Sequence, residues 1–154
     1  MSLVQRDYIL RLIEAVGAAL ARILKRRQEG DLTGARREVD IAVMDLLGRV
    51  AGIATHADSR TAADLVGDGH RLTLWAQLLT QDAELLRLMG REAEAESSDR
   101  RAVELLLEAY LRDGALLTDA SALFATLSAR VSDGALTERY RSARAGLPGE
   151  PNAA

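Results

Sequence analysis

The 154-residue chain has no cysteine, only two prolines, and few aromatic residues. The absence of cysteine excludes a disulfide scaffold, thiolate catalysis, and zinc or iron–sulfur sites built on cysteine. Both prolines, Pro148 and Pro151, lie in the last seven residues, so no proline interrupts a helix before them. The net charge of −3 and the pI near 5.4 argue against a general nucleic-acid-binding protein.

Long apolar runs are also missing from the chain. Near the N-terminus, charged residues such as Arg6, Asp7 and Arg11 interrupt the apolar residues, so the run that a signal peptide requires is absent. No segment approaches the roughly 18 consecutive apolar residues that cross a membrane. We therefore expect a soluble protein, cytoplasmic by default.

The residues that are present favour helix. Leucine and alanine dominate, β-branched residues are sparse, and no stretch alternates with period two. Apolar residues recur every three or four positions, which is typical of amphipathic helices. The predicted helices cover residues 3–28, 33–54, 61–66, 70–89, 92–112, 117–130 and 134–145. The sequence thus predicts an all-α domain over 1–146, with six to seven antiparallel helices stacked as hairpins, and a disordered tail over 147–154.

The apolar stripes also predict the core. The stripe of the first helix is expected to be buried and comprises Val4, Tyr8, Leu12, Val16, Leu20 and Ile23. Helix 70–89 is apolar on two sides, which predicts that it packs between neighbouring helices. Trp75 and Phe124 lie on apolar stripes, and we expect both in the core.

A short pattern recurs at two helix–helix junctions. Gly30 is followed five residues later by Ala35, and Gly90 is followed five residues later by Ala95. The stretch ELLRLMGREAEAESSDRRAVELLLEA resembles a tetratricopeptide-like helical hairpin. The resemblance implies stacked hairpins, although the repeat's usual proline is absent and the 60-residue separation departs from its period.

The N-terminal stretch RDYILRLIEAVGAALARIL carries a second resemblance. It is similar to the start of a small, all-helical bacterial family of unknown function. The signature is Asp7, Tyr8, Ile9, Arg11, Ile13 and Glu14. This resemblance implies a helical fold and a bacterial origin, and it carries no activity.

The two histidines form one candidate metal site. Each has an aspartate two residues away, giving His56 with Asp58 and Asp68 with His70. Imidazole and carboxylate ligate zinc and similar ions, and the short helix 61–66 could fold the two pairs together. The alternative is that all four are polar residues at helix ends.

Basic residues at the first helix–helix junction form a candidate anion or acidic-partner patch. Lys25, Arg26 and Arg27 end the first helix, where cations suit the helix dipole. Arg36 and Arg37 lie near the start of the second helix, where cations are unfavourable, which suggests a ligand. The alternative is an ordinary solvated surface, because acidic residues lie nearby.

No nucleophile–base pair or glycine-rich phosphate loop is recognisable, and we expect no cofactor. The leading interpretation is a non-catalytic interaction or scaffold module that binds a protein or peptide, because helical hairpin stacks present concave surfaces. The alternative is a small-molecule or metal-binding regulator, or an enzyme, that uses the His56/His70 region. Small residues and two-sided apolar helices also predict a homodimer, with helices 3–28 and 70–89 as donors, and we expect neither a nucleic-acid nor a membrane partner.

Overall fold

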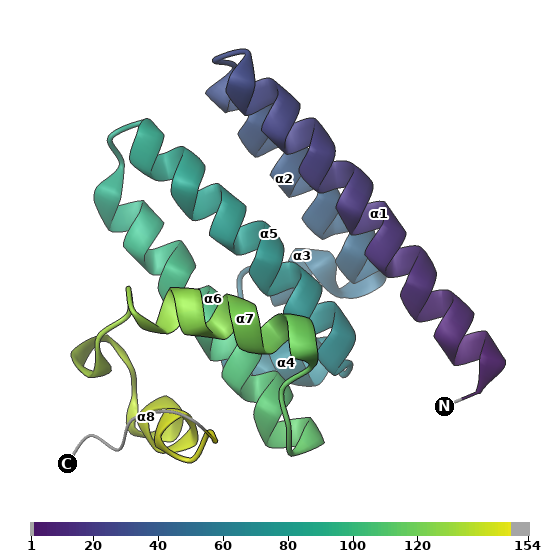
Figure 1. The fold of residues 1–154 in the computed structure, drawn as a ribbon, viewed down its shortest axis with the longest axis vertical. Helices are drawn as coiled ribbons and strands as arrows, with labels where there is room; N and C mark the ends of the chain where they lie inside the picture. The colour runs from purple at the N-terminus through teal and green to yellow at the C-terminus, as the bar shows by residue number, and fades with distance from the viewer. Residues whose placement is uncertain (1, 149–154) are drawn as a thin grey trace.

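The computed structural model describes residues 2–148, and every secondary-structure element within that range is a helix (Figure 1). The predicted all-α class is therefore confirmed. The long helices are α1 (Leu3–Gln28), α2 (Leu32–Leu47), α5 (Gly69–Leu88) and α6 (Glu92–Asp113). The shorter elements are η1 (Gly48–Val50), α3 (Ala51–Ala54), α4 (Ser59–Val66), α7 (Thr118–Ser128), η2 (Asp133–Ala135) and α8 (Glu138–Ala145).

Two antiparallel hairpins, α1–α2 and α5–α6, turn in the same way. Gly30 and Gly90 have φ values of 77° and 76°, a left-handed conformation that glycine adopts without strain. In each turn, the backbone N–H of the residue after the glycine donates a hydrogen bond to the carbonyl five residues earlier. Asp31 donates to Arg26 at 2.9 Å, and Arg91 donates to Leu86 at 2.8 Å. The sequence repeat thus corresponds to a repeated turn, while the wider tetratricopeptide-like arrangement stays a prediction.

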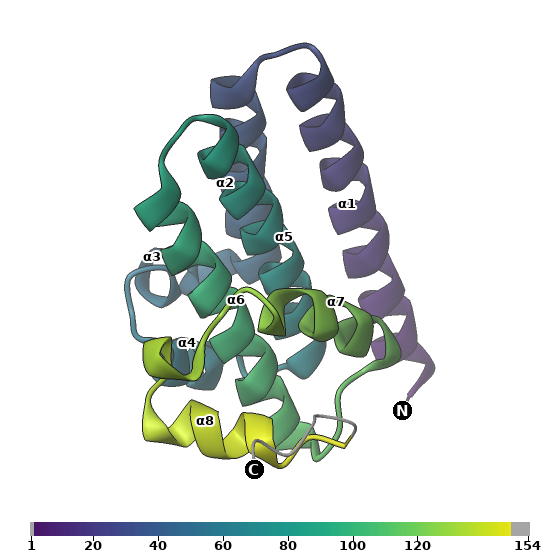
Figure 2. The same ribbon diagram turned by 60° about the vertical axis from the view of Figure 1, so that its left-hand side comes forward.

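Helix α5 lies at the centre of the molecule. It packs against α1 and α2 on one side and against α6 on the other (Figure 2). Its residues Leu72, Leu78 and Leu85 are buried, and Trp75 is 1% exposed. The prediction that this helix packs between neighbours, with Trp75 in the core, is confirmed.

The second predicted helix, 33–54, was expected to be continuous, and this expectation is wrong. Helix α2 ends at Leu47 because Gly48 adopts φ 59° and ψ −128°, outside the helical region. The chain then re-forms helix as η1 and α3 before the turn into α4. The break redirects the chain so that α4 reaches α6.

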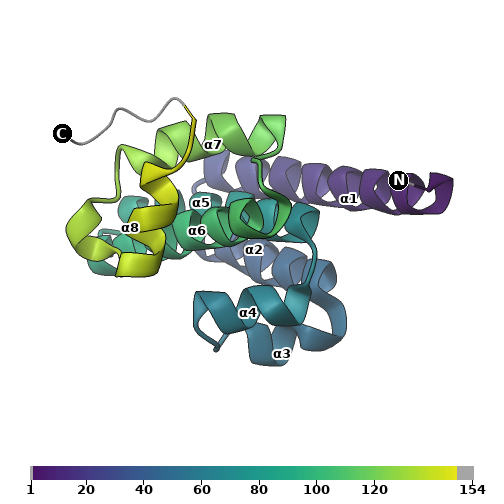
Figure 3. The ribbon, with the colours of Figure 1, turned by 90° about the horizontal axis from the view of Figure 1, so that it is seen from below.

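The C-terminal helices cover the face of the α5–α6 pair opposite to α3 and α4 (Figure 3). Phe124 of α7 is buried, as predicted, in a cluster that also holds Tyr140 of α8. Leu147, the first residue of the predicted tail, is buried in the same cluster, so packing extends at least that far. Of the rest of the predicted tail, Pro148 is exposed, and residues 149–154 lie outside the described residues.

Helix α1 departs most from the prediction. Its buried residues are Val16, Ala19 and Ile23, all in its C-terminal half. Val4 and Tyr8 were expected in the core, but they are 79% and 47% exposed. The N-terminal half is therefore a regular helix that projects away from the other helices (Figure 1). No helix within residues 2–148 has the length and apolar character needed to cross a bilayer.

Candidate functional site

Two neighbouring cavities lie along the side of α1, and together we call them the α1 groove. The larger, about 800 Å³, lies at the N-terminal end of α1, and the smaller, about 420 Å³, lies beside its middle. They share His70 and Leu117. The larger is lined by Gln5, Tyr8, Ile9, Gly67, Asp68, Gly69, His70, Asp113, Ala115, Leu116 and Leu117. The smaller is lined by Ile13, Val16, Gly17, Leu20, His70, Thr73, Leu74, Gln77, Leu117 and Asp119.

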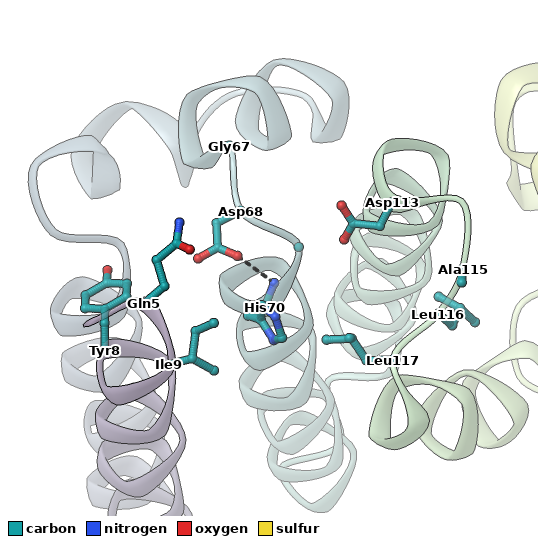
Figure 4. Close-up of a pocket in the computed structure, with 11 residues that line it drawn as sticks. Gln5, Tyr8, Ile9, Gly67, Asp68, His70, Asp113, Ala115, Leu116 and Leu117 are labelled. Atoms are coloured by element: carbon teal, nitrogen blue, oxygen red, sulfur yellow. Dashed lines mark hydrogen bonds between the residues drawn. The ribbon is translucent and has the colours of Figure 1, made fainter. Parts of the chain in front are cut away.

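The start of α5 positions the polar side of the larger cavity (Figure 4). Asp68 caps this helix, because its carboxylate accepts a hydrogen bond from the backbone N–H of His70 at 2.9 Å. Gly69 follows the cap, and a methyl group there would overlap the carboxylate of Asp113 at the end of α6. Glycine at this position thus allows two carboxylates to approach one helix N-terminus.

The lining of the α1 groove is apolar with acidic side chains at intervals. Asp68, Asp113 and Asp119 face the groove, and within residues 2–148 none of them forms an ion pair. The lining residues include no lysine or arginine. A complementary ligand would therefore combine apolar surface with positive charge.

The two predicted His–Asp pairs lie at opposite ends of α4. Asp58 caps the start of this helix, where its carboxylate accepts from the backbone N–H and the hydroxyl of Thr61, and these bonds lower the pKa of Asp58. Asp68 and His70 follow its other end, about 12 Å away for eight helical residues. Among the described residues, no group of three or more His, Asp or Glu side chains is arranged to hold a metal ion. The structure does not gather His56, Asp58, Asp68 and His70 into one site.

The arginines of the predicted basic patch contact carboxylates on other helices. Arg36 donates two hydrogen bonds to Asp82 of α5, at 2.8 and 3.3 Å, and this contact raises the pKa of Arg36. Arg27 donates to Glu84 of the same helix at 2.7 Å. Both arginines therefore join the first hairpin to α5, which accounts for a cation near the start of α2.

The remaining patch residues lie at the outer edge of the first hairpin. Arg26 donates to Asp31 at 3.0 Å across the turn. Lys25 and Arg37 are exposed, and the described part of the chain contains no ion pair for either. The positive charge open to a ligand is thus much smaller than the sequence suggests.

Two acidic residues of the groove, Asp113 and Asp119, were not predicted from the sequence pattern. Asp113 ends α6 and Asp119 begins α7, so each is explained locally by its place at a helix end. The pairing of α6 with α5 brings Asp113 toward His70, and the packing of α7 beside α5 brings Asp119 there, each more than 40 residues later in the chain. The sequence pattern indicated Asp68 and His70 but not these two neighbours.

Comparisons of the chain with protein-family models, with curated proteins and with solved structures found no match. The resemblance of the N-terminal stretch to a bacterial helical family stays a prediction. Any functional assignment therefore depends on the α1 groove and the exposed part of α1.

Proposed function

We propose that this protein is a cytoplasmic, non-catalytic protein-interaction module. Its docking surface is the N-terminal half of α1 together with the α1 groove. The antiparallel hairpins support this proposal, because such hairpins present extended surfaces to partners. Self-association is one form that this interaction can take.

The observation that carries the proposal is the exposed apolar surface of α1. Leu3 is 79% exposed, Leu10 is 47% exposed and Ile13 is 45% exposed. No residue of α1 before Val16 is buried. An isolated helix of about 13 residues is marginal in water, and contiguous exposed apolar surface on a folded protein marks an interaction site.

The test is affinity capture with the full chain and two matched variants. Ile13→Asp places a charge in the α1 groove, and Ile53→Asp places the same charge on α3, where Ile53 is 65% exposed. We expect a partner, either another protein or a second copy, that binds the wild type and Ile53→Asp but not Ile13→Asp. Equal capture by all three proteins, or no capture by any at physiological salt, would refute the proposal.

One observation favours a second candidate, the binding of a small molecule in the larger cavity. About 800 Å³ is within the size range of ligand sites, and Asp68, His70 and Asp113 line the cavity together with Tyr8. A cationic amine carrying an aromatic or aliphatic group would match this lining. Thermal-shift screening of such amines tests the idea, and a stabilisation that persists unchanged in Asp113→Asn would contradict it.

A further inference from the structure

We infer that a second copy of this chain docks on α1, with the two α1 helices antiparallel. This inference rests on the proposed function and names the partner. The exposed side of α1 carries residues spaced alternately by three and four positions, the spacing of a coiled-coil contact line. This line, the α1 seam, comprises Leu3, Arg6, Leu10, Ile13, Gly17, Leu20 and Leu24.

The α1 seam lies beside the face that α1 buries in its own chain, and the two meet at Leu20, which packs partly against the core. The buried face contains Val16, Ala19 and Ile23, whereas Leu10 and Leu24 of the seam are 47% and 51% exposed. Helix α1 thus has two apolar faces, and the chain covers only one. Helix α5, the other predicted donor to a dimer, buries both of its apolar sides within the chain except at its C-terminal end, where Leu88 is 55% exposed.

Gly17 in the seam has no explanation within a single chain. It lies in the middle of α1 without a positive φ, and a Cβ added there would meet nothing within 4 Å. Glycine inside a helix is unfavourable relative to alanine, so neither the backbone nor the packing of this chain requires it. Close approach by a side chain of a second molecule accounts for the missing Cβ.

Charge complementarity favours a second copy and sets the register. When Leu10 lies opposite the partner's Ile13, Arg6 lies opposite the partner's Gly17 and Leu3 opposite the partner's Leu20. The cavity beside Gly17 is also lined by Asp119, so Arg6 of each copy enters the smaller cavity of the other. Within residues 2–148 neither Arg6 nor Asp119 forms an ion pair. The arrangement is isologous, because each copy provides both the arginine and the carboxylate.

Sedimentation velocity over a concentration series tests this dimer through a charge exchange. We expect the wild type to be dimeric at about 100 μM, because mass action favours the dimer as concentration rises. Arg6→Asp and Asp119→Arg should each weaken the dimer at least about tenfold, since each removes two equivalent pairs and creates like-charge contacts. The double variant restores both pairs with reversed charges and should regain dimerisation.

The double variant separates a direct contact between Arg6 and Asp119 from a folding defect. If each substitution only damaged the fold, the double variant would dimerise more weakly than either single variant. Ile53→Asp, on α3, is the matched control and should dimerise like the wild type, and far-UV circular dichroism should be unchanged in every variant. A wild type that stays monomeric at about 100 μM overturns the inference. So does an Arg6→Asp variant that dimerises normally, or a double variant no better than the single ones.

The outcomes also separate this inference from the proposed function. A monomeric wild type that still captures a different protein, lost in Ile13→Asp, overturns the dimer and leaves the interaction module intact. A dimeric wild type that Ile13→Asp does not dissociate overturns the inference, because the self-contact then lies outside the α1 groove, and it contradicts the proposed function as well when Ile13→Asp also captures every partner that the wild type captures.

Discussion

Tyr140 offers a quantitative test of how α8 is held on α6. Its hydroxyl donates a hydrogen bond to Oε1 of Glu108 at 3.0 Å, and Glu108 is fully buried. Arg139 donates two further hydrogen bonds to the same carboxylate, at 2.7 and 3.0 Å. Tyr140→Phe removes one donor, keeps the ring, and leaves the carboxylate paired with Arg139.

These contacts give the expected loss of unfolding free energy in Tyr140→Phe. A hydrogen bond to a charged group contributes about 1.5–3 kcal/mol, and the retained arginine bonds place the loss at the low end, about 1.5 kcal/mol. With a urea m-value of about 2 kcal/mol/M, the unfolding midpoint should fall by about 0.7 M. Tyr8→Phe is the matched control, since Tyr8 is 47% exposed. A midpoint shift in Tyr140→Phe no larger than that in Tyr8→Phe would refute the reasoning.

The effect of Tyr140→Phe on the free energy of unfolding should also depend on pH. Burial and the neighbouring Glu108 carboxylate raise the pKa of Tyr140 above its ordinary value near 10. Below pH 10 both states keep the phenolic proton, so the stabilisation by Tyr140 is fully present. Above about pH 10 the unfolded chain loses this proton while the folded chain retains it, so stability falls by up to about 1.4 kcal/mol per pH unit. The difference in unfolding free energy between the wild type and Tyr140→Phe should therefore shrink between pH 9 and about 11. A difference that stays constant across that range would contradict the raised pKa of Tyr140.

Four further substitutions test other positions of the fold. Asp82→Asn removes the charge of the carboxylate to which Arg36 donates two hydrogen bonds. Urea unfolding should show that the free energy of unfolding falls by about 1–2 kcal/mol. Arg101→Met removes donors to two carbonyls of the α3–α4 turn and a cation 5.0 Å above the Trp75 ring. This change should cost about 1–3 kcal/mol and alter the emission of the only tryptophan, and unchanged emission would count against it. Gly90→Ala should cost about 1 kcal/mol through backbone strain alone, whereas Gly17→Ala, in helix, should stabilise the isolated monomer by a similar amount.

Helices bounded by left-handed glycines were predictable to within about a residue. The limits of α1, α5 and α6 agree with the predicted ranges because the apolar stripe and the terminal glycine point to the same boundary. The end of α2 was not predictable in this way. Its stripe continues through Ile53, and Gly48 looks no different in sequence from Gly17, which stays helical.

Burial of a stripe was less predictable than its helical period. Periodicity shows that Val4, Tyr8 and Val16 share a side of α1, but only packing shows that Val16 alone is covered. Helix α2 ends beside the middle of α1, so in the N-terminal half of α1 Leu12 packs partly against the core while Val4 and Tyr8 stay exposed. Whether a stripe faces its own chain or a partner depends on lengths and angles that local patterns do not contain.

Long-range ion pairs explain why the predicted basic patch differs from the observed one. The carboxylates that neutralise Arg27 and Arg36 lie on α5, 57 and 46 residues away in the chain. Sequence spacing could suggest only nearby acids. The same limitation hid Asp113 and Asp119, which approach His70 only through the packing of α6 and α7 beside α5.

The distribution of paired and unpaired charge supports placing the function at the α1 groove. Arg36 of α2, Arg101 of α6 and Arg139 of α8 each contact a carboxylate or a carbonyl of a neighbouring element. These contacts stabilise the helix–helix interfaces of a single chain. By contrast, Arg6 of the α1 seam and Asp119 of the α1 groove have no ion-pair partner within residues 2–148, and the seam also carries exposed apolar side chains. Apolar surface and opposite unpaired charges on the same face are the properties that a second molecule would satisfy.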